Sequence, residues 1–168
     1  MTVITRSPAP WLPDSTPDLN RLIVVRALSD VGICEMPPGS NRSGRIDEYV
    51  RAVGSPLGSY WCAAALAAWW REAGAEVPPK EAGSCDTWMM WARHTNRWKA
   101  TPQPGDAVLY GTPKDSNHCG VVVRISPLIL TVEGNTSLGG YDRNGVAVDL
   151  KQLNAPKVVG YISPLPII

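Results

Sequence analysis

A run of apolar residues from Trp61 to Trp70 constrains the fold of this chain more than any other stretch. Most residues in the run form helices well, and Gly74 follows at the distance where a left-handed cap ends a helix. A helix that is apolar on every side belongs in the interior of a protein. The sequence therefore predicts a buried central helix, around which the rest of the chain packs.

Cys62 is expected in the first turn of this helix. At that position the unpaired backbone N–H groups and the positive end of the helix dipole favour a thiolate over a thiol. Cysteine nucleophiles are commonly found at the N-terminus of a buried helix. The alternative is a small apolar residue that packs in the core. This stretch alone favours neither interpretation.

The overall composition is that of one domain with a full core, because the chain has 168 residues. Its 16 basic and 15 acidic residues leave a net charge of +1, and the basic residues form no cluster, so nucleic acid is not expected as a partner. No run of residues is apolar enough for a signal peptide or a membrane span. We therefore expect no membrane insertion and a cytoplasmic site of synthesis, with any action outside the cell dependent on other machinery for release.

The four cysteines are Cys34, Cys62, Cys85 and Cys119. A chain with a full core and no secretion signal is expected to keep them as free thiols. None of them lies in a C-x-x-C pair, and no ligand spacing supports a zinc site built from Cys62, Cys119 and His118. The sequence predicts no metal ion and no cofactor.

The order of elements along the chain indicates the fold class. Residues 1–17 show no periodicity and are predicted to form an irregular lead ahead of a single domain, 18–168. Besides the central helix, the periodicities predict helices at about 18–32, 45–53 and 84–96, and strands at about 107–110, 118–125, 128–134, 145–150 and 157–162. Helices first and strands afterwards predict an α+β domain in which an antiparallel sheet packs against the central helix. The polar segment 137–144 is a candidate for a loop over a binding cleft.

A second group of polar residues lies on the predicted strands. His118 begins one strand, and side-chain alternation in the next strand places Thr131, Glu133 and Asn135 on one face. If the two strands form a hairpin, both Glu133 and Asn135 reach toward His118. A cysteine, an imidazole and a third group that orients the imidazole form the general arrangement for acyl transfer. The alternative for Glu133 and Asn135 is a solvated hairpin face.

Several short motifs together carry a resemblance to a known family. They are Gly32-x-x-Glu35, Asn41, Ile46 and Tyr49, then Trp61-Cys62-Ala63-Ala64, Pro104-Gly105-Asp106, His118-x-Gly120-Val121-Val122 and Val132-Glu133-Gly134-Asn135-Thr136. In this order and at comparable spacing, they resemble the CHAP family of cysteine, histidine-dependent amidohydrolases/peptidases. The resemblance extends over about residues 20–161.

The resemblance implies a papain-like α+β fold, with N-terminal helices packed on an antiparallel sheet of about five or six strands. It implies a peptidoglycan hydrolase that cleaves an amide bond through a thioester, as an N-acetylmuramoyl-L-alanine amidase or a stem-peptide endopeptidase. By position, Cys62 matches the nucleophile, His118 the general base, and Glu133 and Asn135 the two polar residues that complete the site. Such domains occur in phage lysins and antibacterial effectors, and we expect a monomer. The alternative is a non-catalytic module on the same fold that binds cell wall or protein.

Two departures from the family pattern concern the residues before the cysteine. Many relatives have a glutamine there that helps to hold the oxyanion, whereas this chain has Trp61. Tyr60, Trp61 and Asn41 are therefore the candidates for substrate binding or for the second oxyanion donor. Some relatives bind calcium through acidic residues ahead of the cysteine, but residues 55–61 contain no carboxylate, so no such ion is expected. Glu35 is expected to tie down the loop before the second helix.

Overall fold

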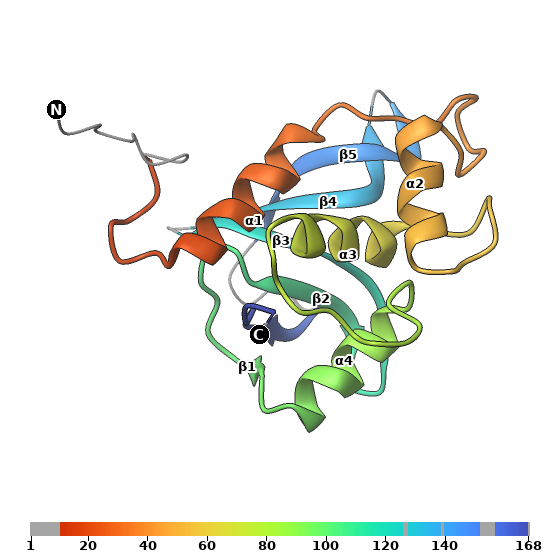
Figure 1. The fold of residues 1–168 in the computed structure, drawn as a ribbon. Coiled ribbons are helices and arrows are strands. Elements are labelled where there is room, and N and C mark those ends of the chain that lie inside the picture. Colours follow the sequence, from red (N-terminus) through yellow and green to blue (C-terminus); the bar gives the residue numbers. More distant parts are fainter. Residues whose placement is uncertain (1–10, 126–127, 139, 152–156, 168) are drawn as a thin grey trace, which may run out of the picture.

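The computed structural model describes residues 11–125, 128–138, 140–151 and 157–167. In this part of the chain four helices precede one six-stranded sheet (Figure 1). The helices are α1 (Asp18–Ser29), α2 (Gly44–Ala52), α3 (Cys62–Glu72) and α4 (Cys85–His94). The strands are β1 (Trp98–Lys99), β2 (Ala107–Thr112), β3 (Asp115–Ile125), β4 (Ile129–Leu138), β5 (Tyr141–Lys151) and β6 (Val158–Ile162).

The sheet has the strand order β1-β6-β2-β3-β4-β5, and every pair of neighbours is antiparallel. The predicted α+β class, with helices on an antiparallel sheet as in papain-like folds, is thereby confirmed. None of the described helices combines the length and the apolar character that a membrane crossing requires.

The helix α3 is the centre of the core. Every residue from Cys62 to Trp70 is buried, and α3 packs against β3 and β4 while it contacts α1 and α2. Figure 1 shows α3 in the middle of the molecule, with α2 beyond one of its ends. The predicted buried central helix is confirmed, and its packing fixes the place of Cys62.

A buried carboxylate at the end of α1 ties α2 and α3 together. Asp30 accepts hydrogen bonds from the indole of Trp69 on α3, at 2.9 Å, and from the hydroxyl of Tyr49 on α2. The guanidinium of Arg45, also on α2, forms an ion pair with it at 3.2 Å. Since these partners satisfy the buried charge, the three helices hold a fixed relation to one another.

Two predictions made from sequence differ from the structure or lie partly outside it. The predicted loop at 137–144 is mostly strand in the described residues, because β4 continues to Leu138, β5 begins at Tyr141, and these two residues pair. The hydroxyl of Ser137 donates a hydrogen bond to Asp142 at 3.1 Å, so polar side chains support the pairing here. In the predicted lead, residues 1–10 lie outside the described residues, and residues 11–17 form turns.

The contact between α3 and β4 gives a test of the fold around the site. A Cβ added to Gly134 would lie 2.9 Å from the Cβ of Ala65 and 2.9 Å from the indole of Trp61. We expect Gly134→Ala to lower the free energy of unfolding by about 1–3 kcal/mol, because the added carbon presses on two side chains, Ala65 and Trp61, that are themselves fully buried. Gly44→Ala is the matched control, since an added Cβ there meets nothing within 4 Å.

Urea or guanidinium unfolding measures both variants. Gly44→Ala should be neutral or stabilise by up to about 1 kcal/mol, because alanine restricts the unfolded chain and suits a helix. Equal stability of Gly134→Ala and the wild type would contradict the close packing of α3 on β4.

Candidate active site

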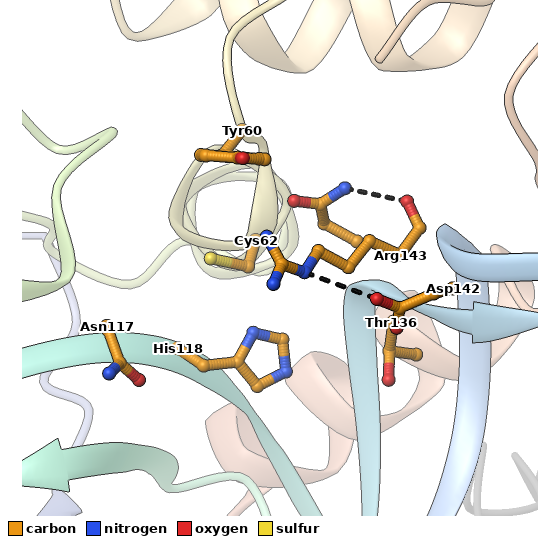
Figure 2. Close-up of a pocket in the computed structure, with 8 residues that line it drawn as sticks. Tyr60, Cys62, Asn117, His118, Thr136, Asp142 and Arg143 are labelled. Carbon is orange, nitrogen blue, oxygen red and sulfur yellow. Dashed lines mark hydrogen bonds and ion pairs between the residues drawn. The ribbon is translucent and has the colours of Figure 1, made fainter. Parts of the chain in front are cut away.

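A cleft of about 480 Å³ opens over the first turn of α3 (Figure 2). Residues from α3, β3, β4 and β5 and from the turn before α3 line it: Tyr60, Cys62, Asn117, His118, Asn135, Thr136, Asp142 and Arg143. Cys62 is the first residue of α3 and is 8% exposed. Its backbone lies at the helix end, where N–H groups have no partner one turn earlier. The cleft therefore brings a cysteine, a histidine and free backbone donors together.

His118 lies on β3, which begins three residues earlier than predicted, at Asp115, and a buried carboxylate contacts the His118 ring on the side away from the cleft. Its Nε2 lies 2.8 Å from Oε2 of Glu133, which is on β4 and 1% exposed. The other carboxylate oxygen, Oε1, accepts hydrogen bonds from the hydroxyls of Tyr110, at 2.6 Å, and Thr131, at 2.8 Å. The Tyr110 ring also stacks on the imidazole at a centroid distance of 5.6 Å. These contacts fix the orientation of the imidazole and leave its other nitrogen for Cys62.

The surroundings favour a charged pair of Cys62 and His118. Hydrogen bonds from the thiols of Cys119 and Cys85 hold the pKa of Cys62 well below its usual value. His118 adds a hydrogen bond and a positive charge, and together these effects outweigh burial. Burial alone would lower the pKa of His118, but its hydrogen bonds to Cys62 and Glu133 raise that pKa to about 10. A thiolate beside an imidazolium is the reactive form of a cysteine nucleophile.

Asn135 lines the same cleft but does not lie behind the imidazole. The pairing of β4 with β5 shifts register between Glu133 and Thr136, and Asn135 has a φ of 55°. This irregularity interrupts the alternation on which the sequence prediction depended. The Asn135 amide therefore donates to the backbone carbonyl of Arg143, at 2.9 Å, and to Oδ1 of Asn41, at 3.2 Å.

Glu35, Trp61 and Asn41 form a support behind the cleft. Glu35 is 1% exposed and accepts hydrogen bonds from the indole N–H of Trp61, at 3.0 Å, and from the backbone N–H of Asn41, at 2.8 Å. The Asn135 amide lies 3.3 Å from the same carboxylate. Glu35 thus ties the loop before α2 to α3 and β4. Because the Trp61 indole is buried and its N–H is engaged by Glu35, it does not face a substrate in this cleft.

Tyr60 is the sequence candidate that lies open in the cleft. Its side chain is exposed, and the guanidinium of Arg143 lies over the ring at 5.5 Å from the centroid. Figure 2 shows the Arg143 side chain extending through the cleft toward Tyr60 and Cys62. Arg143 pairs with Asp142 at 3.6 Å, and sequence reasoning named neither residue. The signal was the polar segment 137–144, which indicated a cleft but not which of its residues enter it.

The fold and the site together define a class: a papain-like α+β domain with a cysteine at the start of its central helix and a histidine on the facing sheet. A family model described as CHAP domain matches residues 54–135, which identifies a CHAP domain in this chain. The matched segment contains Cys62, His118, Glu133 and Asn135. CHAP domains are in general cysteine-dependent amidases or peptidases that act on peptidoglycan. No curated protein and no solved structure matches the chain.

Proposed function

We propose that this protein hydrolyses an amide bond of bacterial peptidoglycan through a thioester on Cys62. The observation that carries the proposal is the position of His118, which lines the same cleft as Cys62 and has its Nε2 2.8 Å from the buried carboxylate of Glu133. A binding module has no need of this alignment, whereas acyl transfer requires it.

The reaction proceeds in two halves. In the first, the Cys62 thiolate attacks the amide carbonyl carbon, and the protonated His118 gives its proton to the leaving amine as the C–N bond breaks. In the second, neutral His118 takes a proton from water, the resulting hydroxide attacks the thioester carbon, and the Cys62 thiolate leaves. The products are an amine and a carboxylic acid, and the thiolate and imidazolium are restored.

The developing oxyanion needs donors at the start of α3. The backbone N–H of Cys62 is one, because it belongs to the first turn and points out of the helix end. The exposed Tyr60 hydroxyl is our candidate for the second, since this ring borders the cleft on the side of Cys62. Trp61 and Asn41 act instead through the support that holds Glu35 and Asn135 in place.

The experiment that tests the proposal is digestion of purified cell walls and of defined muropeptides, followed by mass analysis of the products. An amidase separates the whole stem peptide from the muramic acid, whereas an endopeptidase produces fragments of the stem peptide. Either result supports amide hydrolysis and identifies the bond. Retention of the chain on walls without any new product would favour a binding module.

We propose a role as a phage lysin or an antibacterial effector, since both act on the wall after other machinery releases them.

The charged pair predicts the pH dependence of the reaction. Between the lowered pKa of Cys62 and the pKa of about 10 at His118, both groups hold their reactive protonation states. We therefore expect kcat/KM to stay high through neutral pH and to fall as the pH rises through about 10, when His118 loses the proton that the leaving amine needs.

The measurement is kcat/KM on a soluble muropeptide as a function of pH, in a buffer with EDTA to remove thiol-binding metal ions. An alkaline limb near the ordinary histidine pKa of about 6.5 would show that neither Cys62 nor Glu133 stabilises the charged ring. Far-UV circular dichroism at each pH separates a loss of activity from a loss of fold.

A further inference from the structure

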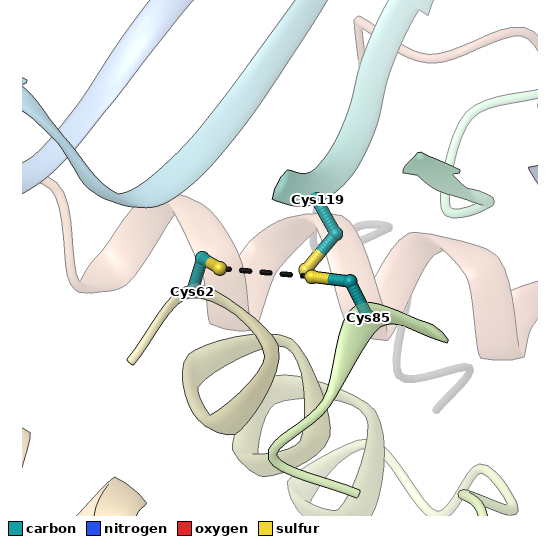
Figure 3. Close-up of side chains that lie close together, drawn as sticks. All are labelled: Cys62, Cys85 and Cys119. Atoms are coloured by element: carbon teal, nitrogen blue, oxygen red, sulfur yellow. Dashed lines mark hydrogen bonds between the residues drawn. The ribbon is translucent and has the colours of Figure 1, made fainter. Parts of the chain in front are cut away.

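Three of the four cysteines meet at one point in the core. Cys62 begins α3, Cys85 begins α4, and Cys119 lies on β3 next to His118. Their sulfur atoms all lie within 4.8 Å of one another, and those of Cys62 and Cys85 are 3.7 Å apart (Figure 3). Three separate elements thus direct thiols to one place, and only Cys62 among the three lines the cleft.

The spacing of these sulfur atoms suits a thiophilic metal ion. Zinc binds thiolates at about 2.3 Å, so two sulfur ligands of a tetrahedral ion lie about 3.8 Å apart. The Cys62 and Cys85 sulfurs are already at 3.7 Å, and the third thiol needs only a small movement. Carboxylate and imidazole ligands play no part in the cluster, which favours zinc over magnesium or calcium.

Two helix ends also favour negative charge at the cluster, which opposes the burial that raises the pKa of Cys85 and Cys119. Cys62 and Cys85 each occupy the first position of a helix, and α3 and α4 have 11 and 10 residues. Two positive helix ends therefore meet at the cluster and stabilise negative charge on the sulfurs. Zinc with three thiolates carries a net charge of −1, which this setting favours.

We propose that Cys62, Cys85 and Cys119 form a Zn²⁺ site that holds the enzyme reversibly inactive. Binding of the ion displaces the remaining thiol protons to solvent and forms three Zn–S bonds. A fourth ligand, such as water, comes from the cleft that Cys62 lines. No oxidant or reductant takes part.

The inhibitory consequence rests on the proposed function, because the sulfur that binds zinc is the one that attacks the substrate. Once its lone pair is donated to the ion, Cys62 cannot attack a carbonyl carbon. Removal of zinc by a chelator restores the free thiolate. By binding the ion together with Cys62, the two neighbours Cys85 and Cys119 therefore make the nucleophile unavailable to the substrate.

A cadmium titration tests metal binding without any activity assay. The reduced, metal-free full chain is titrated with Cd²⁺, and the ultraviolet charge-transfer band of cadmium–thiolate bonds is recorded; Zn²⁺ then competes for the site. We expect saturation at one ion per chain. Cys85→Ser and Cys119→Ser should each weaken binding by more than about 100-fold, since even residues behind a metal ligand matter by about 10- to 100-fold.

The matched control is Cys34→Ser, which makes the same change at a cysteine outside the cluster and should bind like the wild type. A titration without saturation, or equal affinity in all variants, would overturn the site. Should a buried serine prevent folding, X-ray absorption at the zinc edge of the wild type decides instead: three sulfur ligands support the site, and one or two overturn it.

Wall hydrolysis in the presence of Zn²⁺ separates this inference from the proposed function. Inhibition at the concentrations that fill the site, reversed by EDTA, supports the regulatory role. Hydrolysis that continues with the site filled overturns that role alone. If the chain has no hydrolase activity, the cadmium and absorption measurements still decide whether the metal site exists.

Discussion

Cys62→Ala is expected to lower the rate of wall hydrolysis by about 10⁵-fold, because removal of the nucleophile leaves only substrate binding and the oxyanion donors to assist water. The change removes one sulfur atom from a small buried side chain, so the fold should persist. The measurement is loss of turbidity of purified walls together with product masses. Circular dichroism of the variant confirms that the chain is folded.

Cys34→Ala is the control for this experiment. Cys34 is half-buried, lies on the segment between α1 and α2, and does not line the cleft, so we expect the wild-type rate. Equal lysis by the wild type and Cys62→Ala would show that this sulfur has no part in the reaction.

Alkylation compares the reactivity of the four cysteines directly. Iodoacetamide should modify Cys62 much faster than the other three cysteines at neutral pH, whereas slow and uniform labelling would contradict an activated thiolate.

The central helix shows what the sequence predicts well. A helix formed by an unbroken apolar run is compatible only with the protein interior. In the structure each residue from Cys62 to Trp70 is buried. The same local signal places Cys62 at the helix start. Strand alternation also brings Glu133 to His118, since Gly120 pairs with Glu133 across β3 and β4. Local periodicity suffices where secondary structure is regular.

Other parts of the site depend on features that periodicity does not contain. Asn135 leaves the face of Glu133 because the strand takes a left-handed residue at a register shift. Arg143 enters the cleft from β5, where it has a φ of 50° beside a second register shift, between Thr136 and Leu138. Cys85 meets Cys62 only when α4 packs beside α3, a contact between residues far apart in the chain. Irregular backbone and long-range packing are tertiary properties, so the sequence pattern did not reveal these three positions.

Glu133→Gln is the second change with a large expected effect, because it alters one charge without altering shape. In the wild type, one carboxylate oxygen accepts two hydroxyl hydrogen bonds, from Tyr110 and Thr131, and the other faces Nε2 of His118. A glutamine keeps an oxygen for the two hydroxyls and turns its amide toward the imidazole. The amide N–H₂ cannot accept the proton of the charged ring, so the imidazolium loses its partner.

We expect kcat to fall by about 10³-fold with little change in KM, since the lost contact stabilises the charge and tautomer of His118 and does not bind substrate. The alkaline limb of the pH profile should also move to lower pH, because Glu133 is one of the groups that raise the pKa of His118. A merely structural role of Glu133 would not move that limb. Glu81→Gln makes the same change at an exposed site and should behave as the wild type. An unchanged kcat in Glu133→Gln, with a large loss in Asn135→Ala, would assign the orientation of the imidazole to Asn135 and require the cleft to rearrange when substrate binds.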